Sequence, residues 1–243
     1  MVYKGKGKSK TLTAKVDKLI RIENHRRPEP KFADGLFSDQ FTSNSAAGGT
    51  QIDVIAQGDT ASTRNGDMAT FFGLQGYLQL TGGFYGSTST SAINPIPRCR
   101  VLIALCKDNR QAVGAPAFTE VWSPQSGDGT VGFKNWDNRK SWTVLYNKVI
   151  NLPCSNMKPT STNSGAVTAP FSSMGGEHPT RNLKVHLKLR HRVQYPAAST
   201  AGNYELGKNH MFIWFITDTQ LASGASAPPS YVFTYRMLFN DPQ

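Results

Sequence analysis

Lysine and arginine are the residues whose type and spacing point most directly to a chemistry. The first 31 residues contain ten of them against three acidic residues, a net charge of +7 out of +11 for the chain of 243 residues. Such a segment neutralises phosphates and releases counterions, which gives salt-sensitive, sequence-tolerant binding. We expect a nucleic-acid partner, with an anionic membrane surface as the weaker alternative. The candidate binding residues in this segment are Lys4, Lys6, Lys8, Lys10, Lys15, Lys18, Arg21, Arg26 and Arg27.

The basic segment has an internal organisation of its own. Residues 1–10 alternate Lys with Gly or Ser, a composition typical of disorder. From about 11 to 26, apolar residues fall on one half of a helical wheel and basic residues on the other, which predicts a short amphipathic helix that ends before Pro28. A tail that only aids solubility, or a nuclear-import signal, is an alternative interpretation of residues 1–27. Residues 28–49 are interpreted as a linker and residues 50–243 as one domain.

The rest of the chain is predicted to be all-β. Eight apolar or alternating stretches are separated by loops rich in Gly, Pro, Ser, Thr and Asn, and no second helix is evident. Strands without crossover helices form the antiparallel sheets of a sandwich or barrel. The predicted strands are residues 51–56, 68–80, 98–107, 117–122, 141–152, 182–195, 208–218 and 231–239.

Three of these strands carry basic residues on a face opposite to their apolar residues. Apolar and basic residues take turns along 182–195, so one face should pack in the core and the other should meet solvent or a charged partner. A weaker alternation in 98–107 also predicts outward-facing cations. In 231–239 the alternation predicts that Arg236 faces outward. The stretch 208–218 is apolar on both sides, which predicts a central, doubly covered strand. The candidate binding residues on the strands are Arg98, Arg100, Lys184, Lys188, Arg190 and Arg192.

Other polar and aromatic groups admit both a chemical and a structural interpretation. Arg64 with Asp59 and Asp67 could form a catalytic cluster, but a loop held by an ion pair or an Asx-turn is the favoured interpretation. Aromatic residues near Arg139 could stack on bases, although core or subunit-interface contacts are favoured for them. These aromatic residues are Trp136, Trp142 and Tyr146.

No catalytic or metal-binding pattern stands out, so neither an enzyme nor a cofactor is expected. The five His residues lack metal-ligand spacing, acidic clusters for Mg²⁺ are absent, and Glu177-His178 has no second carboxylate or nucleophile nearby. The three cysteines, which form no CxxC pair, are interpreted as reduced structural thiols of an intracellular product. Neither a secretory signal nor a membrane span is expected.

The stretch IDVIAQGDTASTRNGDMATFFGLQGYLQL carries a family resemblance. The stretch contains I-x-Q-G-D, then a short polar loop, then R-x-G-D before a long alternating strand. This order of motifs resembles that in coat proteins of the satellite tobacco necrosis virus type. The same pattern is similar to the capsid proteins of circular Rep-encoding single-stranded DNA viruses. NRKSWTVLYNKVINL resembles their R-F-x-I-L-x-D strand, with Trp142 for Phe and Asn147 for Asp. The resemblance follows the strand order over most of the chain. Its matching residues in the first motif are Gln57, Gly58, Asp59, Arg64, Gly66 and Asp67.

This resemblance implies an eight-stranded jelly-roll sandwich with sheets BIDG and CHEF, in an icosahedral T=1-like shell of about sixty copies. The basic arm would lie inside and package a single-stranded genome, DNA favoured over RNA, in a virion assembled in the host nucleus or cytoplasm. With the strands lettered B to I in order, D (98–107), G (182–195) and I (231–239) would share a sheet. One basic patch facing the genome would then comprise Arg98, Arg100, Lys184, His186, Lys188, Arg190, Arg192 and Arg236. Structural calcium between subunits is allowed by the resemblance, without identifiable ligands.

Two rival functions belong to other classes. A cellular jelly-roll binding module of lectin or cytokine type, with a nucleic-acid-binding tail, predicts a monomer or trimer in solution. A nucleic-acid enzyme predicts metal-dependent cleavage that single carboxylate substitutions abolish.

Overall fold

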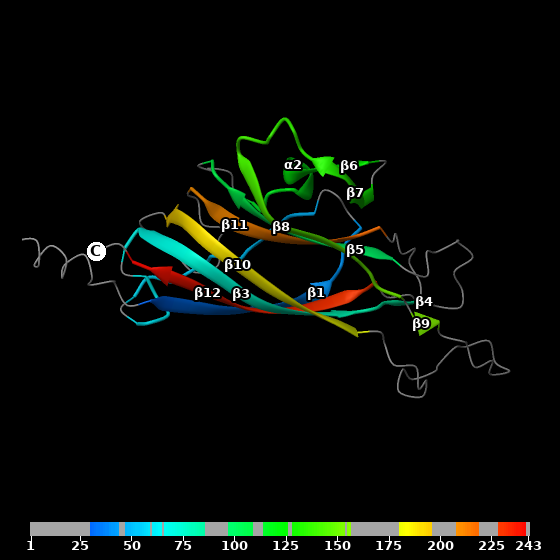
Figure 1. Cartoon of the computed structure of the whole chain (residues 1–243), viewed down its shortest axis with the longest axis horizontal. Helices are drawn as coiled ribbons and strands as arrows, with labels where there is room; N and C mark the ends of the chain where they lie inside the picture. The colour runs from blue at the N-terminus through cyan, green and yellow to red at the C-terminus, as the bar shows by residue number, and fades with distance from the viewer. Residues whose placement is uncertain are drawn as a thin grey trace, which may run out of the picture.

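Two four-stranded antiparallel sheets form the main body of the protein (Figure 1). The computed structural model describes residues 30–43, 47–58, 60–64, 66–85, 97–108, 114–125, 128–153, 155–156, 180–195, 208–218 and 228–241. In chain order its elements are β1 (Lys31–Gln40), β2 (Thr50–Gln51), β3 (Met68–Thr81), β4 (Phe84–Tyr85), β5 (Arg98–Cys106), α2 (Phe118–Val121), β6 (Trp122–Gln125), β7 (Asp128–Lys134), β8 (Trp142–Asn151), β9 (Ser155–Asn156), β10 (Thr180–Gln194), β11 (His210–Thr217) and β12 (Ser230–Asn240). The all-β prediction is confirmed.

The first sheet has the strand order β1-β12-β3-β10, which places β10 at one edge. Along β10 the burial alternates with period two: Val185, Leu189 and Val193 are buried, whereas the side chains at the even-numbered positions from 184 to 192 are exposed. Period-two burial is what a strand shows when one face packs on a core and the other meets solvent. The alternation predicted for residues 182–195 is therefore confirmed.

The second sheet has the order β2-β11-β5-β8. Every residue of β11 is buried, which confirms the prediction of a central strand covered on both faces. The prediction that 98–107 shares a sheet with 182–195 and 231–239 is wrong, because β5 pairs with β11 and β8 instead. The error came from the strand count. Residues 28–49 were interpreted as linker, so the first strand of the fold was missed and the next strands were counted one place too early.

That missed strand is β1, which pairs with β12 along its whole length. Its sequence KFADGLFSDQ does alternate, but the inward positions include small residues, Ala33 and Gly35, that weaken the apolar pattern. A Cβ on Gly35 would overlap the ring of Tyr235 on the neighbouring strand. The partner strand thus supplies the bulk that β1 lacks, and hydrophobicity along β1 alone does not reveal its inner face.

A small outer layer made of α2, β6 and β7 covers the far side of the second sheet (Figure 1). Residues 117–122 were predicted to be a strand, yet 118–121 form one helical turn before β6 begins. The Glu120 carboxylate accepts a hydrogen bond from the Ala117 N–H at 3.1 Å, which supports the turn. Phe118 and Val121, at helical spacing, pack onto β5 and β11.

The main core lies between the two sheets and joins aromatic residues of both. Phe215 of β11 and Tyr231 of β12 stack with ring centroids 3.6 Å apart, and Phe41 contacts both rings edge-on. The apolar face of 231–239, opposite to Arg236, thus packs in the core as the alternation predicts. Of the predicted strand at 51–56, only Gln51 belongs to a strand, β2. No helix in the described part of the chain has both the length and the apolar character needed to cross a bilayer.

Candidate nucleic-acid interface

The outer face of β10 carries a row of cations. Five basic side chains at alternate positions are all exposed, and within the described ranges none of them takes part in an ion pair. Alternate residues of a regular strand are about 6.7 Å apart, and an irregularity in the pairing with β3 between Lys188 and His191 interrupts this spacing within the row. We call it the β10 row; its members are Lys184, His186, Lys188, Arg190 and Arg192.

Arg98 and Arg100 do not join the β10 row, which corrects their predicted placement. Arg98, on β5 of the other sheet, contacts two carboxylates, Asp128 at 2.7 Å and Asp218 at 2.9 Å. The hydrogen bond to Asp218 raises the pKa of Arg98, and the two carboxylates compensate its charge. Its guanidinium is part of an ion-pair cluster that ties β5 to β7 and to the end of β11.

Arg100 was predicted to point outward, but the outer layer buries it and leaves it 4% exposed. Its Nε donates to the Gly129 carbonyl at 3.0 Å, and Nη2 donates to the Thr130 carbonyl at 2.6 Å. Nη1 donates to the Asn147 side chain. Burial lowers the pKa of Arg100, because the charged form loses hydration. The side chain anchors β7 to β5 and β8, and its solvent-facing role in the prediction is wrong.

Arg236 points outward from β12, as predicted, but it is not an uncompensated charge. Both ends of its guanidinium donate to the Asp34 carboxylate at 2.7 Å, and its Cζ lies 4.5 Å from the centre of the Phe32 ring. The hydrogen bond from Arg236 lowers the pKa of Asp34. This bidentate pair makes the β1–β12 side of the face close to neutral.

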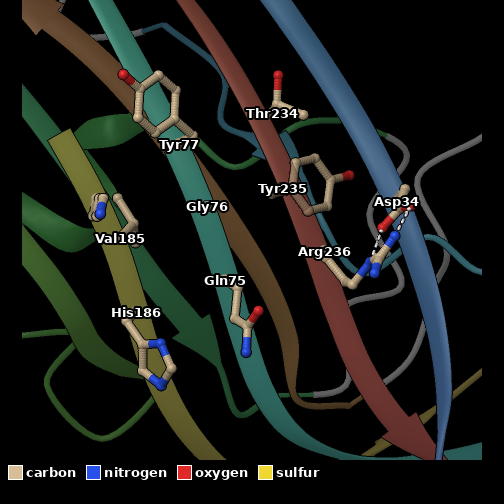
Figure 2. A pocket seen from close by; sticks show the side chains of 10 residues that line it. Asp34, Gln75, Gly76, Tyr77, Val185, His186, Thr234, Tyr235 and Arg236 are labelled. Carbon is tan, nitrogen blue, oxygen red and sulfur yellow. Dashed lines mark hydrogen bonds and ion pairs between the residues drawn. The ribbon is translucent and has the colours of Figure 1, made fainter. Parts of the chain in front are cut away.

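A shallow depression of about 600 Å³ lies between the β10 row and the Arg236–Asp34 pair. Figure 2 shows Tyr77 and Gln75 on β3 in its middle, with His186 on one side and the ion pair on the other. The strand register explains this arrangement. One row across the sheet reads Asp34, Arg236, Gln75 and His186, and the row two residues along contains Tyr77 between Thr234 and Lys184.

The structure separates the three aromatic residues that were considered together. Trp142 is 2% exposed and packs in the outer-layer core, and Tyr146 packs half-buried against the main core, so the core interpretation is confirmed for both. Trp136 is different, because its side chain is 72% exposed with the Arg139 guanidinium 4.0 Å from its ring centre. For Trp136 the core interpretation is wrong, and an interface role stays a prediction.

Arg64 has a structural role in the loop before β3. It is fully buried, donates from Nε to the Ile55 carbonyl at 3.2 Å, and lies 4.3 Å from the centre of the Tyr195 ring. Arg64 Nη1 lies 3.9 Å from Asp67 Oδ1, so the ion pair expected for this loop is confirmed. Asp59, Cys154, Glu177 and His178 lie outside the described residues.

A buried polar cluster at the start of β11 was not predicted. Asp53 accepts hydrogen bonds from the Met211 N–H at 2.9 Å and from Gln51 Nε2 at 3.1 Å, and it lies 3.3 Å from His210 Nδ1. The available signal was the pair Gln51 and Asp53, polar residues on either side of Ile52 in an otherwise apolar stretch. The cluster joins β2 to β11, and within the described ranges no group of three or more His, Cys, Asp or Glu could hold a metal ion.

The candidate residues of the basic arm, Lys4 to Arg27, and the helix predicted over 11–26 lie outside the described residues. Their role stays a prediction from sequence. No protein-family model matches the chain, and no curated protein matches it. In the described part of the chain, the candidate interface consists of a row of cations without acidic partners, a depression with an exposed tyrosine, and the Arg236–Asp34 ion pair on the opposite side.

Proposed function

We propose that this chain is a viral capsid subunit that assembles with copies of itself into a small icosahedral shell around a single-stranded genome. The observation that carries the proposal is the β10 row, five exposed cations on one sheet face with no acidic partner in the described structure. A basic sheet face in a chain whose sequence also begins with a basic segment is typical of a nucleic-acid-binding protein.

The strand order supports a jelly roll as the fold of that subunit. If β1, β2, β3, β5, β8, β10, β11 and β12 are lettered B to I, the two sheets read B-I-D-G and C-H-E-F. These are the sheets that the family resemblance implies. In this lettering 98–106 is strand E rather than D, and the basic strand 180–194 is G.

The two outer faces of the sandwich differ, as expected for a subunit of a closed shell that has an inner and an outer surface. The outer layer of α2, β6 and β7 covers the second sheet, whereas no segment of the described ranges covers the outer face of the first sheet, which carries the β10 row. We assign the face with the β10 row to the shell interior and the covered face to the exterior. The genome is proposed to be DNA in preference to RNA, with the arm and the β10 row sharing its neutralisation.

The experiment is to express the full chain and examine it by size-exclusion chromatography and negative-stain microscopy. Shells that carry nuclease-protected nucleic acid support the proposal, and digestion with DNase or RNase after opening identifies the genome type. A deletion of residues 1–27 should sharply reduce the packaged nucleic acid. A chain that stays monomeric or trimeric and ignores polyanions in dilute buffer would contradict the proposal and favour the lectin- or cytokine-like alternative.

A further inference from the structure

The depression on the first sheet has the composition of a nucleotide subsite. We propose that it holds one unpaired base of a single-stranded nucleic acid stacked on Tyr77, with the adjacent phosphates on Lys184 and Lys188 of the β10 row. This inference rests on the proposed function, because it requires a polyanion on this face. It adds a mode of contact, the stacking of an unpaired base, and a residue, Tyr77, that charge alone does not identify.

Tyr77 is the residue that turns a charged face into a base-binding one. It is 48% exposed in the middle of the sheet, on β3, with Thr234 of β12 on one side and Lys184 of β10 on the other. Large aromatic side chains are usually buried or in contact with a partner. Base stacking on an exposed aromatic ring beside a basic groove is how single strands are bound without sequence selection.

The charge distribution around the depression gives the ligand an orientation. The β10 side carries Lys184, His186 and Lys188, all exposed. On the opposite side, Asp34 would repel a phosphate, but the bidentate hydrogen bonds from Arg236 compensate its charge. Phosphates therefore belong on the β10 side, and the neutral base belongs toward β12.

Gln75 supplies polar contacts suited to a base edge. It is exposed on β3 two residues before Tyr77, and Figure 2 shows its amide in the same depression as His186. An amide offers both a donor and an acceptor, so it can pair with more than one kind of base. A duplex has no free ring face to offer Tyr77, since its bases stack on each other, and the subsite thus selects single strands.

Two other occupants fit this face less well. A second copy of the same face would bring two β10 rows together, and like charges repel. The basic N-terminal segment of the chain itself, with its net charge of +7 over residues 1–31, would meet the same repulsion. The charge complementarity favours an anionic ligand, and the exposed ring favours one that carries aromatic bases.

The test uses the full chain, freed of nucleic acid in high salt, and a fluorescent oligothymidylate. Tyr77→Leu should weaken binding by about 5- to 150-fold, whereas the matched control Tyr77→Phe, which keeps the ring, should stay within about twofold. The salt dependence should be the same in both variants, because no charge is removed. Circular dichroism and thermal unfolding verify that each variant is folded.

A direct readout removes any contribution of the basic arm. An oligonucleotide with 5-iodouracil in place of thymine crosslinks on irradiation to aromatic rings that stack on it, and mass spectrometry should locate the crosslink at Tyr77. A crosslink found only elsewhere, or unchanged affinity of Tyr77→Leu, would overturn the subsite and leave the proposed function standing.

Two further ligands, compared with the oligothymidylate, separate the possible failures. A duplex and a heparin fragment of matched charge should bind Tyr77→Leu and the wild type equally. If Tyr77→Leu lowers the affinity for all three ligands equally, the face is a general polyanion or polysaccharide surface. That result would overturn the single-strand assignment. A wild type that binds none of them contradicts the proposed function itself.

Discussion

The guanidinium of Arg100 lies over the indole of Trp122, with Cζ 4.1 Å from the ring centre. This contact joins β5 of the second sheet to the outer layer that covers it. It explains why an arginine at an apparently outward position is buried: Trp122 and the carbonyls of Gly129 and Thr130 replace water around its charge.

Arg100→Met should therefore destabilise the protein strongly. The substitution leaves two buried carbonyls and the Asn147 side chain without their donor, and we expect a loss of about 3 kcal/mol in the free energy of unfolding, measured in urea. The matched control Arg192→Met, on the exposed side of β10, should change it by less than about 0.5 kcal/mol. Equal stability of the two variants would show that the buried network is not needed for the fold.

Removal of charge from the β10 row should reduce the salt dependence of binding. For single strands the slope of log affinity against log salt has a magnitude of about 0.7 per neutralised phosphate. The double variant Lys184→Gln with Lys188→Gln removes two charges, so the magnitude of the slope for oligothymidylate should fall by about 1.4. Cations on an edge strand also discourage pairing with another sheet, and that role alone predicts an unchanged slope. The control is Arg139→Gln with Lys140→Gln in the turn between β7 and β8, which removes the same charge away from the β10 row and should leave the slope unchanged.

The stability of the protein should fall in mild acid because of His191. This residue stacks on Phe71 with centroids 5.6 Å apart. Burial lowers its pKa below the ordinary 6.5; Asp53 opposes this shift, and His210 adds to it. A group with a lowered pKa in the folded state binds fewer protons there than in the unfolded chain. The contribution of neutral His191 to the free energy of unfolding is complete above pH 6.5. It is lost as the pH falls through the folded-state pKa.

His191→Phe should flatten this part of the pH profile. The comparison is the free energy of unfolding at pH 7.5 and pH 5.0, where the wild type should lose more than the variant. His186→Phe, at an exposed position of the same strand, is the control and should keep the wild-type profile. If His191→Phe and the wild type have parallel profiles, His191 is not the source of the acid sensitivity.

Gly35 should be intolerant of even one added methyl group. A Cβ there would overlap the ring of Tyr235, which also stacks on Phe37 and Phe233 with centroids 5.3 Å away in each case. Gly35→Ala should destabilise the protein by about 1–3 kcal/mol in urea unfolding, because the ring would have to leave its stacked position against Phe37 and Phe233. Gly66→Ala, where a Cβ meets nothing within 4 Å, should be nearly neutral. Similar values for both substitutions would place the effect in the unfolded chain rather than in this contact.

Much of the fold was readable from local patterns. The period-two alternation of 182–195 identified both the inner and the outer face of β10, and the doubly apolar 208–218 identified β11 as central. Such patterns are local because a strand turns successive side chains to opposite faces whatever its partners are. The exposed cations of the β10 row were identified for the same reason.

Tertiary structure alone decided which strands are neighbours and which faces are covered. β1 was hidden because its inward positions include the small residues Ala33 and Gly35, and the space over Gly35 is filled by Tyr235 of a strand about 200 residues later in the chain. Arg100 looked solvent-facing although Leu102, Ala104 and Cys106 follow it on the same side, a hint that this side is buried. The position of Tyr77 beside Lys184 likewise depends on the register of β3 with β10. Alternation along one strand reports its two faces, but pairing and coverage depend on contacts between distant segments, which no local pattern contains.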